Sequence, residues 1–82
     1  MKLGIYSLKK ILFQGNAESV NVKTASGEIT ILDHHRPLIS IVKPGTIKIV
    51  DMNKKEHFIP VNSGFVEVNS ANQAKLIVDE AV

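Results

Sequence analysis

Apolar and polar residues alternate along short segments of this chain. In residues 19–23, for example, Val20 and Val22 alternate with polar neighbours. A period of two places one set of side chains on a single face of a β-strand, whereas no segment of ten or more residues has the period of about 3.6 of a helix. The pattern predicts strands at residues 3–8, 11–13, 19–23, 28–31, 38–42, 46–50, 56–61, 65–68 and 74–78.

Turn residues separate these segments about every 8–12 residues, a spacing typical of a β-sandwich or barrel of eight or nine strands. A polar loop at residues 33–36 ends at Pro37. Pro60 lies inside an expected strand and lacks the N–H of a ladder bond, which predicts an edge strand or a bulge. The expected turns are at residues 14–15, 25–27, 43–45, 51–55, 62–64 and 69–72.

The composition supports an all-β chain with little or no helix. The chain has many β-branched residues, namely ten isoleucines, nine valines and three threonines, and only six leucines. β-Branched residues fit a pleated sheet better than a helix. With 82 residues and no cysteine, we expect one domain, residues 1–82, without disulfides. A domain of this size buries only about 60% of its unfolded surface, so partner subunits are expected to add stability.

The charge balance argues against a nucleic-acid reader. The net charge is +2, nine of the ten basic residues are lysines, Arg36 is the only arginine, and aromatic residues make up 5% of the chain. Nucleic-acid readers rely on arginine and on aromatic stacking. No apolar run approaches the about 20 residues of a membrane span, and the N-terminus lacks the apolar stretch of a secretory signal. We therefore expect a soluble, intracellular protein.

A metal site is one hypothesis for the polar loop. Asp33, His34 and His35 are residue types that bind zinc, and His57 is the remaining histidine. Adjacent loop residues point in different directions, however, and His57 lies on a strand distant in sequence. A polar loop without metal is the simpler interpretation.

A carrier domain is a second hypothesis, because Lys54 and Lys55 occupy an expected hairpin tip, as a lipoylated or biotinylated lysine does. Their neighbours do not match the motif around such a lysine, and exposed turns are normally polar. For catalysis, Glu28 has no second carboxylate, nucleophile or base beside it, and no glycine-rich phosphate loop is present. The residues alone favour a binding or assembly role without catalysis or cofactor.

An ordered set of segments adds a resemblance. Residues 27–32 read Gly-Glu-Ile-Thr-Ile-Leu and are followed by a short loop with His35 and then by Pro37, Leu38 and Ile39. In this order they resemble the N-terminal domain of the ATP synthase epsilon chain, the small central-stalk subunit of the F-type enzyme. Further matches, which extend the resemblance over residues 2–82, lie at residues 12–15, 18–22, 43–49, 63–68 and 76–82.

The resemblance implies a ten-stranded β-sandwich of short, mostly antiparallel strands. It also implies a rotor subunit of the proton-translocating F-type ATP synthase, non-catalytic and without cofactors or metals. Such a subunit packs on the gamma subunit and on the ring of c subunits and rotates with both during ATP synthesis. It would be peripheral, within the F1 sector, at the cytoplasmic face of the inner (plasma) membrane of a bacterium rather than in an organelle.

Two contact surfaces follow from the same resemblance. The turn with Glu28 matches the family's contact with the polar loops of the c-ring, and the loop before Pro37 matches a position near gamma. The expected c-ring contacts are Ser26, Gly27 and Glu28, and the expected gamma contacts are His35, Arg36 and Leu38.

The chain departs from the family's pattern in two places. Asp33 and His34 stand where the family usually has proline and then glycine or asparagine, and Arg36 replaces a small residue. Both changes add charge or bulk to the expected gamma surface. Family members also continue, beyond the equivalent of Val82, into two helices that inhibit ATP hydrolysis and in some bacteria bind ATP. We therefore expect no inhibition by that route from this sequence.

Overall fold

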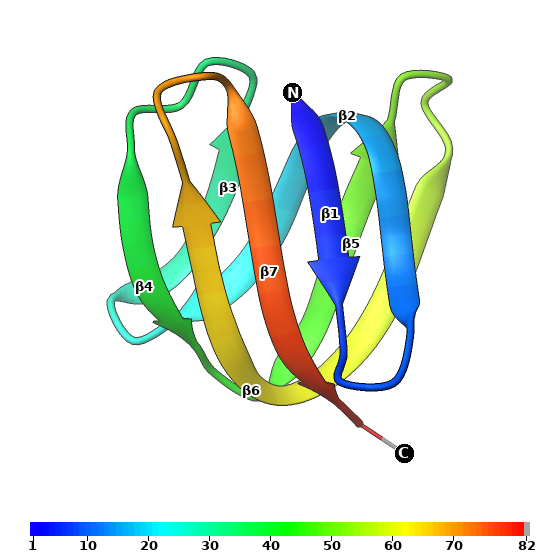
Figure 1. Ribbon diagram of the computed structural model, residues 1–82, viewed down its shortest axis with the longest axis vertical. Coiled ribbons are helices and arrows are strands. Elements are labelled where there is room, and N and C mark those ends of the chain that lie inside the picture. The colour runs from blue at the N-terminus through cyan, green and yellow to red at the C-terminus, as the bar shows by residue number, and fades with distance from the viewer. Residues whose placement is uncertain (82) are drawn as a thin grey trace.

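The computed structural model describes residues 1–81, in which every regular element is a β-strand (Figure 1). The strands are β1 (Lys2–Tyr6), β2 (Ile11–Thr24), β3 (Gly27–Leu32), β4 (Leu38–Val42), β5 (Gly45–Asp51), β6 (Glu56–Val68) and β7 (Gln73–Glu80). Over this described range, the search for a helix long and apolar enough to cross a membrane finds none. The prediction of an all-β fold is confirmed.

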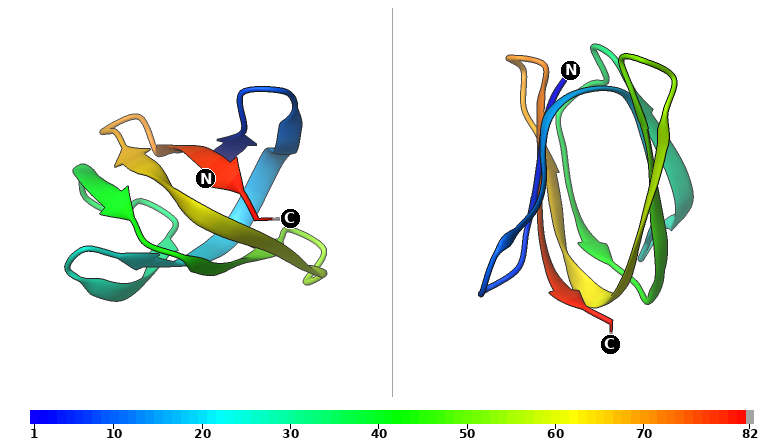
Figure 2. Two further views of the ribbon diagram at one scale, coloured as in Figure 1. Left: turned by 90° about the horizontal axis from the view of Figure 1, so that it is seen from below. Right: turned by 90° about the vertical axis from the view of Figure 1, so that its right-hand side faces the viewer.

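The sheet folds into two layers because its two longest strands pass from one layer to the other (Figure 2). The first half of β2 pairs with β1, whereas its second half pairs with β3 and β5. The first half of β6 pairs with β5, and its second half pairs with β4 and β7. Layer A contains β1, β4, β7, the first half of β2 and the second half of β6, and layer B contains the rest. The strand pairs named above are all antiparallel, whereas β1 and β7, which also pair, are parallel.

Two of the turns that the sequence predicted lie inside strands, residues 14–15 in β2 and residues 62–64 in β6. In β6 the pairing register shifts at this point, between Val61 and Ser63, whereas in β2 it shifts a few residues later, between Ala17 and Ser19. Such bulges bend a strand without ending it. Pro60 directly precedes the shift in β6, as its missing N–H predicted. The sandwich therefore has seven continuous strands where the resemblance implied ten. Because β2 and β6 each serve both layers, the seven strands correspond to the nine segments that the alternating pattern predicted.

The core lies between the layers and consists of alternate strand residues. Val20 and Val22 of β2 are fully buried, as the alternating pattern predicted. The same holds for Ile47 and Ile49 of β5, of which at most 1% is exposed. Other fully buried side chains belong to Leu3, Ile5, Ile31, Val42, Val66 and Leu76. Since alternate residues point inward, the remaining residues form the outer faces, where partners can bind.

Candidate functional site

The turn between β2 and β3 carries Ser26, Gly27 and Glu28, the expected c-ring contacts. The buried hydroxyl of Thr24 donates a hydrogen bond to the carbonyl oxygen of Gly27 at 2.8 Å and accepts one from the N–H of Ser26 at 3.2 Å. Gly27 has a φ of 117°, which residues with a side chain rarely adopt. The turn is therefore held from the core side, while residues 25–28 are exposed to solvent.

The loop of residues 33–37 connects β3 to β4 and carries the expected gamma contacts. The N–H of His35 donates to the carbonyl oxygen of Leu32 at 3.1 Å, and its Nδ1 lies 2.7 Å from the carbonyl oxygen of Arg36. The Arg36 side chain is exposed, His35 is half-buried, and Leu38 packs against the core at the start of β4. The structure therefore brings these three predicted residues together on one loop and the strand that follows it.

The two expected contact surfaces lie at opposite ends of β3 (Figure 1). This strand has six residues, and a strand rises about 3.3 Å per residue, so the turn at Gly27 and the loop after Leu32 are roughly 20 Å apart. The strand joins them directly, and β2 supports it along its whole length. The arrangement can hold two partners at a fixed separation.

The outer face of layer A carries exposed apolar side chains on three adjacent strands. Ile41, Phe65 and Ile77 are cross-strand neighbours on β4, β6 and β7. Their exposed fractions are 50%, 61% and 47%, and that of Ile39 on the same face is 77%. We call these four residues the apolar row. Contiguous exposed apolar side chains with a polar rim are typical of protein–protein contact sites.

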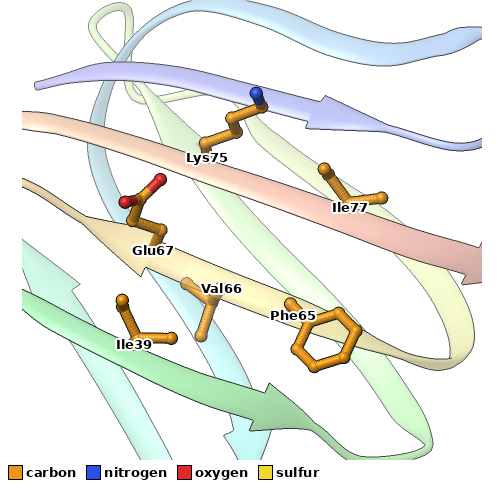
Figure 3. A pocket seen from close by; sticks show the side chains of 6 residues that line it. All are labelled: Ile39, Phe65, Val66, Glu67, Lys75 and Ile77. Carbon is orange, nitrogen blue, oxygen red and sulfur yellow. The ribbon is translucent and has the colours of Figure 1, made fainter.

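The apolar row borders a shallow pocket with charged residues at one side (Figure 3). Ile39, Phe65 and Ile77 line the pocket together with Glu67 and Lys75. Glu67 and Lys75 are direct neighbours on β6 and β7, so one acidic and one basic side chain adjoin the apolar surface. This combination suits a partner that brings apolar side chains and a few polar groups.

The sequence alone did not reveal the apolar row. The apolar run at residues 38–42 predicts a mostly buried strand, which is wrong for Ile39 and Ile41. A continuous apolar run does not show which of its residues face the core. The clearest signal was on β6, where the buried Val66 and Val68 require Phe65 to point outward.

The whole chain matches a known protein family. A sequence model described as the β-sandwich domain of the ATP synthase delta/epsilon chain covers residues 1–82. The chain belongs to this family. An ATP synthase epsilon chain from a Nitratiruptor species is 39% identical over 82 residues, which are 100% of this chain and 63% of that protein. The resemblance carried by residues 27–32 is thereby confirmed.

Two solved structures share the delta/epsilon-type sandwich. One is a chain of the mitochondrial ATP synthase of Euglena gracilis, with a TM-score of 0.91 and 19% identity, covering 100% of this chain and 52% of that chain. The other, from the central stalk and c-ring of the Tetrahymena thermophila mitochondrial enzyme, has a TM-score of 0.81 and 16% identity, covering 98% of this chain and 63% of that chain. At these identities the likeness shows the fold. The chain thus spans between about half and two thirds of the length of these relatives.

The histidines of this delta/epsilon-type sandwich do not gather at one point. His57 Nε2 lies 2.8 Å from Asp51 Oδ2, and its ring packs edge-on against Phe13 with 5.3 Å between the centroids. In residues 1–81, no group of three or more His, Cys, Asp or Glu side chains could hold a metal ion. The hypothesis of a metal site that combines His34 and His35 with His57 therefore has no support in the geometry.

The lysines at the tip between β5 and β6 also have a structural role. Lys54 Nζ lies 2.6 and 2.8 Å from the two carboxylate oxygens of Glu18. The neighbouring Lys55 donates its backbone N–H to Asp51 Oδ1 at 3.0 Å. The ion pair fastens the tip to β2, whereas a carrier lysine needs a mobile arm. The geometry therefore does not support the carrier hypothesis at Lys54.

Asp33 lies at the base of the loop that carries the expected gamma contacts. Its Oδ1 accepts hydrogen bonds from the α-ammonium group of Met1 and from Asn72 Nδ2, both at 2.7 Å. The hydrogen bond from the ammonium group, followed by that from Asn72, lowers the pKa of this carboxyl below its ordinary value of 3.8. The ionised carboxylate is therefore the form that the folded chain stabilises.

Acid is expected to weaken the folded state partly through Asp33. Because the folded-state pKa is lowered, the carboxylate stabilises the fold above pH 3.8, and this contribution is lost as the pH falls below 3.8 toward that lowered pKa. In urea titrations from about pH 6 to about pH 2.5, the free energy of unfolding of Asp33→Asn should fall less steeply than that of the wild type. Asp51, whose pKa His57 lowers, remains in both proteins. Equal acid slopes would contradict the assignment.

Proposed function

We propose that this chain is the non-catalytic β-sandwich of an ATP synthase epsilon chain, a rotor part of the central stalk of a proton-translocating F-type enzyme. The observation that carries the proposal is the family match over residues 1–82, together with 39% identity to a bacterial epsilon chain. The chain would attach the gamma subunit to the c-ring and turn with both. It would need no cofactor and would lie peripherally at the cytoplasmic face of a bacterial inner membrane.

The separation of the two expected surfaces supports a coupling role. A rotor part transmits torque by staying attached to both neighbours without yielding between them. The turn with Ser26, Gly27 and Glu28 would hold the c-ring, and the loop with His35 and Arg36 would hold gamma. β3 joins these ends inside a hydrogen-bonded ladder, so relative motion of the two ends would require breaking strand pairs. Rigidity, and not chemistry, would be the contribution of this chain.

We also assign the apolar row to gamma. Leu38 begins β4 and packs against the core, whereas Ile39 and Ile41 of that strand point outward and belong to the row. The row therefore begins at Ile39, two residues after the end of the loop, and would extend the expected gamma surface onto the outer face of layer A. A permanent subunit contact resembles a protein core cut in half, and burial of Phe65 and Ile77 would supply that apolar area.

Binding to purified subunits tests the proposal. Immobilised gamma should retain the chain in a pull-down, and a purified c-ring in detergent should increase the retained amount in the presence of gamma. An unrelated β-sandwich of similar charge serves as the negative control. Failure to bind gamma and the c-ring, alone or together, would overturn the proposed role.

Glu28→Lys is expected to weaken the c-ring contact more than the fold. Glu28 is exposed in the turn, and replacement of an exposed residue usually changes the free energy of unfolding by less than about 0.5 kcal/mol. Reversal of its charge at an interface should lower the affinity for the c-ring several-fold, as titration of the ring with labelled chain would measure. Glu67→Lys, the same charge change on layer A, is the matched control. Equal losses in stability and ring affinity would defeat this assignment.

A further inference from the structure

The turn between β6 and β7 holds the expected gamma loop through one side chain, that of Asn72. Its Nδ2 donates to Asp33 Oδ1 at 2.7 Å, and its Oδ1 accepts the N–H of His34 at 2.7 Å. These partners lie 39 and 38 residues away in the sequence. The two loops lie beside each other at one end of the sandwich (Figure 1). The amide nitrogen and the amide oxygen of Asn72 therefore both form hydrogen bonds with the loop of residues 33–37.

The backbone of Asn72 is itself fixed. Its carbonyl oxygen accepts the N–H of Lys2 at 3.1 Å, which ties the turn to the first residue of β1. Its φ is 59°, and that of His34 is 60°, a left-handed conformation that asparagine adopts more readily than most residues. Asn72 thus connects an anchored turn to a loop in which His34 also has a left-handed backbone conformation.

The loop has few other links to the sandwich. The bond from the His35 N–H to Leu32 and the contact between the His35 ring and Arg36 lie within the loop or at its edge. Besides Asn72, Asp33 has the bond from the α-ammonium group of Met1, which is also held by the carbonyl oxygen of Ala17. The orientation of the residues that follow Asp33 therefore depends largely on the Asn72 amide.

We infer that Asn72 is a positioning residue for gamma binding, which holds His35 and Arg36 in the orientation that the partner accepts without touching the partner itself. This inference rests on the proposed gamma contact. The loop is exposed, so loss of the amide should leave the sandwich folded. The loop would then have to be ordered during binding, and the ordering of a loop at an interface lowers affinity. Asn72 should consequently affect affinity much more than stability.

The test compares four variants of the chain with the wild type. Asn72→Gly removes the amide and retains the left-handed backbone, and Ser70→Gly in the same turn is the matched control. Asn72→Asp sets a carboxylate against Asp33, and the double variant Asp33→Asn with Asn72→Asp exchanges the two groups while restoring a donor and an acceptor. Calorimetric titration with gamma, thermal unfolding and proton–nitrogen NMR spectra provide the readouts.

We expect Asn72→Gly to weaken gamma binding about tenfold with a melting temperature within a few degrees of the wild type. The NMR changes should be confined to residues 33–38 and the turn, and the His34 amide signal should move most. Ser70→Gly should bind like the wild type, Asn72→Asp should bind more weakly, and the exchanged pair should recover most of the affinity. A rescue of this kind would not follow from a merely structural loss.

Two results would overturn the inference. One is wild-type affinity of Asn72→Gly for gamma, and the other is an unchanged signal of the His34 amide in that variant. Failure of the wild-type chain to bind gamma is a different outcome, because it would refute the proposed function. In that case local NMR changes in Asn72→Gly would still support the hold on the loop, while the role in gamma binding would fall with the proposed function.

Discussion

Replacement of Gly64 by alanine is expected to lower the free energy of unfolding by about 3 kcal/mol. A methyl group at Gly64 would overlap the carbonyl oxygen of Ile77 and would lie 2.8 Å from the Cα atom of Val78. These are backbone atoms of β7, which pairs with β6 on both sides of this point. Neither strand can move away without breaking its ladder, so the strain cannot relax locally.

Gly4→Ala is the matched control for this substitution. A methyl group there would overlap the hydroxyl oxygen of Tyr6, which is the far end of a partly exposed side chain. Rotation of the tyrosine relieves the clash, so we expect a loss below about 1 kcal/mol. Urea denaturation of both variants measures the difference. Equal losses would mean that the close approach of β7 to Gly64 has no energetic consequence.

The expected loss is large relative to the stability of so small a fold. Globular proteins are stabilised by about 0.05–0.15 kcal/mol per residue, so a chain of 82 residues has about 4–12 kcal/mol in total. Gly64→Ala would remove a quarter to three quarters of that amount. At the lower end of the range, a measurable fraction of the chain would be unfolded at 37 °C.

Gly64 also illustrates which features the sequence could not predict. Asparagine, serine and glycine at residues 62–64 are turn-forming residues, and a local pattern predicts a reversal there. In the structure the chain continues as β6, and Gly64 is the position where the backbone of β7 approaches closely. Residues 14–15 mislead in the same way within β2. A bend inside a long strand and a turn between short strands share one local signal, and only the strand partners distinguish them.

The core could be predicted because its signal is local. Val20, Val22, Ile47 and Ile49 are buried wherever their strands pair, since alternation alone sets the face to which they belong. The number of strands required tertiary information, and so did the outward orientation of Ile39. A run of apolar residues at 38–42 is compatible with either face, and the layer that β4 joins decides between them.

The candidate contact surfaces likewise differ in whether a local sequence pattern could predict them. The turn at residues 26–28 was evident from its glycine and from the resemblance, and the structure adds only the hydroxyl of Thr24 that holds it. By contrast, the hydrogen bonds of Asn72 to the expected gamma loop connect residues that are separated by 38 and 39 positions in the sequence, and no local pattern links them. The apolar row likewise combines β4 with β6 and β7, although β5 separates β4 from β6 in the sequence.

Phe65→Ser is expected to reduce the affinity for gamma at least about 30-fold, or about 2 kcal/mol, with little change in stability. Phe65 is the central member of the apolar row, between Ile41 and Ile77, and interface energy is concentrated in central aromatic residues of this kind. Its side chain is 61% exposed in the isolated chain. Loss of its cross-strand contacts should therefore lower the free energy of unfolding by no more than about 1 kcal/mol.

Phe58→Ser provides an unusually close control. Phe58 lies on the same strand and is 60% exposed, but it belongs to the half of β6 in layer B, where it faces Lys48 of β5. The two variants remove the same side chain with nearly the same exposure and differ only in the layer that loses it. Titration of gamma with each variant should give a large loss for Phe65→Ser and a loss below about threefold for Phe58→Ser. If both bind alike, gamma does not use the apolar row, and its contact must be sought on the loop of residues 33–37 alone.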